Sequence, residues 1–205
     1  MGERRPAAYE LILLAIVLAV LVWSGIEPHD RFTWLLEVAP VLIGLPIVIA
    51  THRRFPLTPL LCVLLAIHAV ILMVGGKYTY AEVPAGFWVR DWLDLERNHY
   101  DRLGHFAQGF VPAILAREIL WRRSPLRGSR WLGFVVISIC LAFSAFYELI
   151  EWWTAAASGE AAESFLGTQG DPWDTQWDMF LALLGAVTSL VLLRRAHDRQ
   201  LASLP

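Results

Sequence analysis

The stretch that decides the fold lies between Ser144 and Asp178. It reads SAFYELIEWW (144–153), then a connection without Lys or Arg, then QGDPWDTQWD (169–178). Glu148 and Glu151 come near the end of one strongly apolar run, and Asp174 and Asp178 open the next. A charged side chain costs roughly 2.5 kcal/mol or more at the centre of a membrane helix, and less near its end. Carboxylates this close to hydrocarbon therefore indicate a functional site at a defined depth in a membrane.

The composition of the whole chain is typical of a membrane protein. Of its 205 residues, 57% are hydrophobic, whereas soluble domains are usually about 45–50% apolar. Six apolar runs approach the roughly 20 residues that cross a bilayer. They are residues 8–26, 32–50, 57–75, 103–121, 131–153 and 177–193. The first run lacks a small-x-small cleavage site, so we interpret it as a retained helix and not a signal peptide. The prediction is one all-α, polytopic membrane domain over residues 1–205, a bundle of six transmembrane helices.

The placement of basic residues predicts the orientation of this bundle. Arginines gather before the first run (Arg4 and Arg5), after the second, around the end of the fourth and after the sixth, whereas acidic residues dominate the alternate connections. Because basic connections stay in the cytoplasm, both termini are expected inside. The polar segment 77–100 is then outside. The apolar spacing in residues 87–95 favours a short amphipathic helix on the outer surface, with a plain loop as the alternative.

With this orientation, acidic residues from several helices reach the outer leaflet at one level. Asp101 and His105 begin the fourth span, Glu148 and Glu151 end the fifth, and Asp174 and Asp178 begin the sixth; Glu37 is close to the outer end of the second. On each of the last three spans the polar residues continue into a stripe of small residues at helical spacing. These stripes are Asp101–His105–Gly109, Cys140–Ser144–Glu148–Glu151 and Asp178–Ala182–Ala186. Small residues allow close helix contact in membranes, so the acidic faces are expected to point into the bundle.

So many carboxylates cannot all stay charged together in a low-dielectric site. One solution is a divalent metal ion held by Asp101, His105, Glu148, Glu151, Asp174 and Asp178. Carboxylates with one imidazole suit Mg²⁺, Mn²⁺, Ca²⁺ or Zn²⁺. A second is a structural network of ion pairs and hydrogen bonds with Arg102, Tyr147 and Thr175, with Arg97 as a further candidate for neutralising the carboxylates. Asp174 alone could instead cap the sixth helix. A third is a proton- or substrate-handling site without metal.

Other classes of site are disfavoured. The net charge of −2 gives no basis for nucleic-acid binding. The two cysteines, Cys62 and Cys140, both lie inside apolar runs, which indicates small core residues and no disulfide framework.

The strings MVGGKYTYAEVP, RNHYDRLGHFAQGF, FSAFYELIEWW and QGDPWDTQWDMF resemble the YjdF family of bacterial inner-membrane proteins over nearly the whole chain. That resemblance implies a multi-pass protein of the bacterial inner membrane and carries no established activity. A more distant likeness is to VanZ-like membrane proteins, through Asp101-Arg102 with His105-Phe106 and through Glu148 with Asp178. Glu151 and the acidic loop after it depart from the VanZ pattern.

Two functions follow as open alternatives. The first is a metal-assisted enzyme acting on a lipid or envelope precursor, with a Glu or His105 as general base. The second is a non-enzymatic binder or small carrier for a cation or proton. A shallow pocket near the lipid would favour the enzyme, and an aqueous cavity at mid-depth would favour the carrier. The sequence specifies neither the substrate nor the oligomeric state.

Overall fold

A computed structural model describes residues 6–158 and 169–204 of the chain, and within these ranges all regular structure is helical. Seven helices are described there: α1 (Ala8–Gly25), α2 (Arg31–Thr51), α3 (Pro59–Tyr78), α4 (Pro84–Leu93), α5 (Tyr100–Arg123), α6 (Trp131–Ser158) and α8 (Asp174–Ala202). Each of the six predicted spans coincides with one long helix. α6 and α8 extend several residues beyond their predicted ends. Two parts of the sequence used for the orientation prediction lie outside the described residues. They are part of the connection after Glu151 and the basic residues Arg4 and Arg5.

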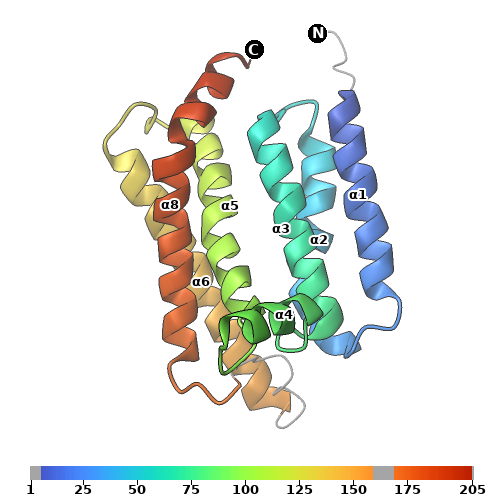
Figure 1. Cartoon of the computed structure of the whole chain (residues 1–205). Helices are drawn as coiled ribbons and strands as arrows, with labels where there is room; N and C mark the ends of the chain where they lie inside the picture. Colours follow the sequence, from blue (N-terminus) through green and yellow to red (C-terminus); the bar gives the residue numbers. More distant parts are fainter. Residues whose placement is uncertain (1–5, 159–168, 205) are drawn as a thin grey trace.

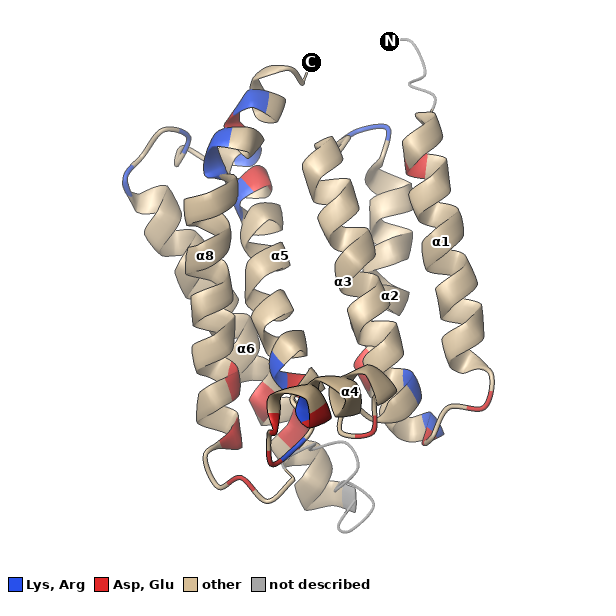
Figure 2. Ribbon diagram, in the orientation of Figure 1, with Lys and Arg blue, Asp and Glu red and all other residues tan. Residues whose placement is uncertain are grey.

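The six long helices run in alternating directions along one bundle (Figure 1). The start of α1 and the end of α8 therefore lie at the same end, and α4 lies across the opposite end (Figure 1). Charged residues gather toward the two ends, and the middle of the bundle is nearly free of them (Figure 2). This is the charge distribution expected of a bundle that crosses a bilayer.

Among the described residues, five helices are long and apolar enough to cross a membrane, namely α1, α2, α3, α6 and α8. α5 does not meet that criterion, although its 24 residues correspond to about 36 Å of helix at 1.5 Å per residue. The reason is its composition, because α5 carries charged residues at both of its ends. Those residues have protein neighbours, since α5 packs against α3, α6 and α8. A polar helix enclosed by apolar ones need not be apolar itself.

Apolar side chains hold the bundle together in three clusters. The first joins α1, α2 and α3 around Val38 and Met73. The second joins α5, α6 and α8 around Ala113 and Val136, and the third links the two halves through Leu61 on α3 and Ile114 on α5. The third cluster fixes α5 between the two groups of helices.

Helices α5 and α8 approach each other at glycines. A Cβ added to Gly109 would lie 1.8 Å from the Ala182 carbonyl oxygen, and one added to Gly185 would lie 2.1 Å from that of Phe106. The two backbones therefore touch along the predicted small-residue stripes, as is common for closely packed membrane helices. This contact sets the spacing of the side chains one and two turns away.

The segment predicted as either an amphipathic helix or a loop forms the helix α4. Pro84 begins it, a position at which the missing proline N–H costs nothing, and Asp94 ends it in the left-handed conformation with φ of 53°. Trp88 and Trp92 are 73% and 82% exposed. Tryptophans placed this way are typical of the boundary between membrane and water.

Candidate metal centre

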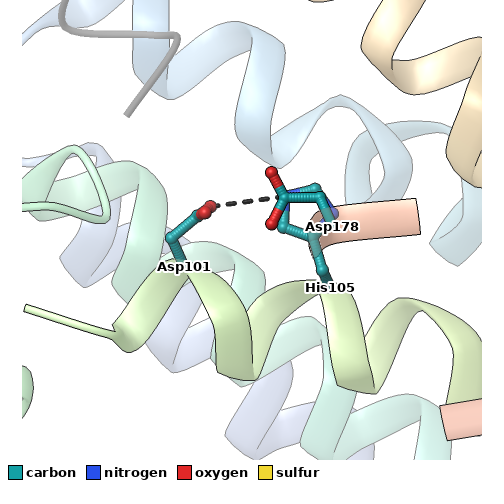
Figure 3. A group of neighbouring side chains, drawn as sticks. All are labelled: Asp101, His105 and Asp178. Carbon is teal, nitrogen blue, oxygen red and sulfur yellow. Dashed lines mark ion pairs between the residues drawn. The ribbon is translucent and has the colours of Figure 1, made fainter. Parts of the chain in front are cut away.

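His105 lies at the centre of the predicted polar constellation. It projects from the same face of α5 as Asp101, toward Asp178 on α8 (Figure 3). His105 Nε2 is 3.4 Å from Asp101 Oδ1 and 3.8 Å from Asp178 Oδ1. On the other side of the ring, Nδ1 is 2.9 Å from Gln108 Oε1 and 4.0 Å from Glu148 Oε1. One imidazole thus faces carboxylates from α5, α6 and α8.

Over the described ranges, two triplets of ligand atoms could each hold a metal ion. One is formed by Asp101, His105 and Asp178, and the other by His105, Glu148 and Glu151; within each triplet the atoms lie within 4.8 Å of one another. Both triplets share His105. Five of the six predicted ligands therefore come together, and the helical spacings 101/105 and 148/151 put each pair on one helix face as predicted.

The cluster is buried, but its hydrogen bonding is incomplete. Asp178 is 2% exposed, and Glu148 and His105 are each 7% exposed. In the part of the chain that the structure describes, Glu148 Oε1, Asp178 Oδ1 and the Ser144 hydroxyl have no hydrogen-bond partner. Buried polar atoms are nearly always partnered, so such exceptions call for an explanation. A bound cation would supply one for the two carboxylate oxygens.

Asp174 occupies a different position from the other five predicted ligands. It lies at the rim, where Arg97 Nη2 donates to its Oδ1 over 3.0 Å. Its side chain does not cap α8, since the residue before the helix is Trp173, for which the described structure shows no side-chain capping hydrogen bond. The sequence placed Asp174 at the correct end of the correct helix, but ion pairing draws its carboxylate toward the arginine.

Arg97 and Arg102, the two arginines predicted to neutralise the carboxylates, also lie at the rim and pair with Asp171 there. Arg102 Nη2 donates to Asp171 Oδ2 over 3.1 Å, and Arg97 Nη2 is 3.5 Å from the same oxygen. Over residues 6–158 and 169–204, no arginine forms an ion pair with Glu148, Glu151 or Asp178. The predicted arginine-based network therefore exists, but it lies beside the carboxylate cluster and does not neutralise it.

Glu37 on α2 adds a further buried carboxylate at this end. The Tyr147 hydroxyl on α6 donates to Glu37 Oε2 over 3.3 Å and lies 3.4 Å from the Leu36 carbonyl oxygen. Glu37 is 6% exposed. Next to it, outside the helices, burial and the nearby Glu37 carboxylate raise the pKa of Tyr80 well above its ordinary value. This tyrosine therefore stays protonated and can act only as a neutral neighbour.

Sequence reasoning missed a second buried polar cluster, which lies at the opposite end of α5 and α8. Glu118 and His197 are both fully buried, and His197 Nε2 is 3.0 Å from Glu118 Oε2. Arg117 Nη1 lies 2.8 Å from His197 Nδ1. Because an arginine can only donate, Nδ1 must accept and Nε2 must carry the proton given to Glu118. The available signal was Glu118 itself, a carboxylate inside the predicted fourth span.

Fold and site together define a multi-pass membrane protein with a buried carboxylate–histidine cluster at one end of its bundle. The chain belongs to the family of predicted membrane proteins described as DUF2238, whose family model matches residues 9–199. It is 59% identical over 182 residues to the inner membrane protein YjdF of Escherichia coli (strain K12), which covers 89% of this chain and 87% of that relative. No solved structure matches it significantly.

These matches confirm the predicted YjdF family and the location in the bacterial inner membrane. They give no support to the more distant resemblance to VanZ-like proteins. Neither the family description nor the name of the relative states an activity. The function must therefore be argued from the site.

Proposed function

We propose that this protein is an integral membrane protein that binds one divalent cation at its outward-facing end and uses it on an envelope or lipid substrate. Asp101, His105 and Asp178 would be the primary ligands, with Glu148 and Glu151 completing the set. The bound cation would polarise a phosphoryl or acyl oxygen. A carboxylate that is not engaged by the cation, or His105, would accept a proton.

The observation that carries this proposal is the pair of unbonded oxygens, Glu148 Oε1 and Asp178 Oδ1. Glu148 Oε1 lies 4.0 Å from His105 Nδ1 and Asp178 Oδ1 lies 3.8 Å from His105 Nε2, so each oxygen faces one nitrogen of the same imidazole. A purely structural network would supply hydrogen-bond donors to both oxygens, because leaving a buried polar atom without a partner costs about 1–3 kcal/mol. Oxygen ligands together with one imidazole are the donor set of Mg²⁺, Mn²⁺ and Zn²⁺ sites.

The shape of this end favours an enzyme over a carrier. A cavity of about 460 Å³ lies at the rim, lined in part by Arg97 and Arg102, and Arg97 also pairs with Asp174, one helical turn before Asp178. A carrier of the kind that uses broken helices would have its site at mid-membrane. Here α2 and α5 are unbroken in spite of Pro40, Pro46 and Pro112, and the carboxylates lie near helix ends.

The proposal includes a single domain of six spans with both termini in the cytoplasm. α5, the predicted fourth span, would cross the membrane in addition to the five apolar helices, since it lies alongside its apolar neighbours in the bundle (Figure 1). α5 ends with the basic residues Arg122 and Arg123, and Lys and Arg gather at the end of the bundle that holds the start of α1 (Figure 2), which supports a cytoplasmic position for that end. A C-terminal green fluorescent protein fusion should fluoresce, whereas activity of a C-terminal alkaline phosphatase fusion would overturn this orientation.

Metal content tests the cation site directly. We would purify the wild-type protein in detergent, together with a Glu148→Gln/Asp178→Asn variant and a Glu82→Gln/Asp91→Asn control, and measure bound metal by mass spectrometry. The control removes the same charge from exposed carboxylates of the α3–α4 region. We expect near-stoichiometric metal in the wild type and the control, and little in the first variant.

Two results would contradict the proposal. If neither the wild type nor the control retains or takes up metal, and the Glu148→Gln/Asp178→Asn variant is much less thermostable, then the carboxylates form a structural network. If both variants bind metal as the wild type does, the cation lies elsewhere.

A further inference from the structure

The rim cavity has chemistry of its own that the cation site does not explain. Its volume of about 460 Å³ falls within the range of small-molecule sites. Among its lining residues are Arg97, His99, Arg102 and Asp171, together with the exposed carboxylates Asp94 and Glu96. Both signs of charge therefore meet in one cavity.

Its polar nitrogens are buried but not fully used. His99 Nδ1 and Arg102 Nε are buried and have no hydrogen-bond partner within the described ranges. Arg102 donates through Nη2 to Asp171, and its guanidinium lies 5.2 Å from the Trp177 ring. A guanidinium offers five donors in a planar fork that matches phosphate oxygens. The unused nitrogens therefore suit an anion with several oxygens.

Asp171 already shows where such an anion would sit. One of its oxygens, Oδ2, lies 3.1 Å from Arg102 Nη2 and 3.5 Å from Arg97 Nη2. A single carboxylate oxygen thus stands between two arginines, while the other, Oδ1, accepts from the Trp173 amide over 2.9 Å. A phosphate has more oxygens than Asp171 can offer here, so it could engage Arg102 Nε and His99 Nδ1 as well.

The walls of the cavity are held in place by hydrogen bonds. The Asn98 amide donates to Gln169 Oε1 over 3.3 Å, and Gln169 Nε2 donates to the Asn98 carbonyl oxygen over 2.8 Å. Asn98 Nδ2 in turn donates to the Val83 carbonyl oxygen over 3.0 Å. These bonds tie the segment before α5 to the segment before α8, so that the arginines and Asp171 face each other without a ligand.

Aromatic residues place the cavity at the level of lipid headgroups. Trp173 and Trp177, beside Asp171 and Arg102, are 63% and 43% exposed, and Trp88 and Trp92 on α4 are exposed at the same end. Exposed tryptophans in a membrane protein mark the interface where headgroups lie.

We propose that this cavity binds a phospholipid headgroup of the phosphoethanolamine type, with its phosphate at Arg97, Arg102 and His99 and its ammonium at Asp94 and Glu96. This inference rests on the proposed function only in that it identifies the substrate class of the neighbouring cation site. Asp101 adjoins Arg102, and Asp178 follows Asp174 by one helical turn. A headgroup phosphate in the cavity would therefore lie beside the proposed cation.

The test is a titration of purified protein with short-chain phosphatidylethanolamine, followed by tryptophan fluorescence, since Trp177 lies against Arg102. The matched probes are short-chain phosphatidylglycerol, glycerophosphoethanolamine and inorganic phosphate. We expect Arg102→Gln to weaken binding of phosphatidylethanolamine at least tenfold. His99→Phe should weaken it several-fold, and because it removes a nitrogen without a hydrogen-bond partner in the described structure, it should leave the fold intact. Arg90→Gln changes a half-buried arginine on α4 that does not line the cavity; it is the control and should change nothing.

Each remaining outcome decides a part of the proposal. Equal binding of phosphatidylglycerol would overturn the ammonium assignment, and equal binding of inorganic phosphate would identify a soluble ligand as the source and overturn the lipid headgroup. No saturable binding, or unchanged binding by both Arg102→Gln and His99→Phe, would overturn the cavity as a phosphate site. Metal content measured on the same samples separates the two proposals. Headgroup binding without metal would overturn only the cation site, and metal binding without headgroup binding would overturn only the headgroup site.

Discussion

At one end of the α5–α8 pair, Glu118 has partners on both oxygens, whereas at the other end Glu148 and Asp178 each keep a buried oxygen without one in the described structure. Glu118 Oε1 accepts from Arg122 Nη1 over 2.9 Å, and Oε2 accepts from the Thr58 hydroxyl over 2.7 Å and lies 3.0 Å from His197 Nε2. Both sets of carboxylates are buried, so burial alone does not distinguish them. The two sets differ in whether every carboxylate oxygen has a hydrogen-bond partner, and this difference separates a structural cluster from a candidate ligand site.

The Glu118 cluster also connects parts of the chain that are far apart in sequence. Arg122 donates to the Pro56 carbonyl oxygen over 2.6 Å and lies 3.6 Å from the Phe55 ring. Arg117 also pairs with Asp198. These contacts join the α2–α3 connection, α5 and α8 at one end of the bundle. Among the residues that the structure describes, no comparable set of arginine contacts stabilises the carboxylates around His105.

The largest expected effect is loss of stability on breaking the complete cluster. Glu118→Ala would leave His197, Thr58 and Arg122 without their shared acceptor, and removing one partner of a buried charged network costs about 3–5 kcal/mol. The free energy of unfolding, measured by denaturant titration in detergent, should fall by that amount. Glu82→Ala is the exposed control and should stay within about 0.5 kcal/mol of the wild type. Equal stability of the two variants would remove the structural role of Glu118.

The incomplete cluster should respond in the opposite way. Glu148→Gln/Asp178→Asn relieves repulsion among the carboxylates, so without metal this variant should be as stable as the wild type or more so. With metal at 100 times its dissociation constant, a single site stabilises the wild type by about 2.7 kcal/mol, and the variant should gain nothing. Paired melting curves with metal and with chelator measure this. A variant that is destabilised with chelator present would make the two ends of the bundle alike.

Acid should weaken metal binding at the same site, because protons compete with a cation for carboxylates and imidazole. Metal affinity of the wild type should therefore fall steadily as the pH is lowered from 7.5 to 5.5. Titration with a fluorescent competitor chelator at each pH measures the affinity. An affinity that is constant over this range would exclude His105 as a ligand, since free histidine titrates near pH 6.5.

The sequence predicted the location of the incomplete cluster because its signals are local. Residue spacing puts Asp101 and His105 on one helix face, and the alternation of helix direction brings the ends of the fourth, fifth and sixth runs to one level. The partners of Asp174 and Glu118 depend on contacts between distant segments. Asp174 meets Arg97 across 77 positions and Glu118 meets Thr58 across 60, and no periodicity of the sequence encodes such pairs. The low hydropathy of α5 likewise became interpretable only once α3, α6 and α8 were seen to enclose it.

A smaller effect should come from the contact that holds both clusters in register. Gly109→Ala places a Cβ against the Ala182 carbonyl oxygen, and overpacking of this kind costs about 1–3 kcal/mol. Gly44→Ala is a matched control in α2, where an added Cβ meets nothing within 4 Å. The control should be neutral or slightly stabilising, since alanine favours helix over glycine by about 1 kcal/mol. If both substitutions behave alike, the α5–α8 contact does not set the spacing of the two ends.

The smallest expected effect concerns a half-buried carboxylate, Asp30, at the same end as the candidate metal centre. Asp30 precedes α2, and its Oδ1 accepts from the Thr33 amide over 2.7 Å. That hydrogen bond is the main reason why the pKa of Asp30 lies below its ordinary value of 3.8. Since the folded-state pKa is the lower one, the stabilisation is fully present above about pH 4 and is lost as the pH falls through the folded-state value.

Asp30→Ala should cost about 1 kcal/mol at pH 7 and progressively less in acid, while Asp30→Asn, which keeps the acceptor, should cost less at pH 7 and show no such pH dependence. Unfolding titrations at pH 7 and pH 3 measure both. If Asp30→Ala lowers the free energy of unfolding as much as Glu118→Ala does, burial adds nothing to the stabilisation by a fully hydrogen-bonded carboxylate. The contrast between the two ends of the bundle would then depend on the unbonded oxygens of Glu148 and Asp178 alone.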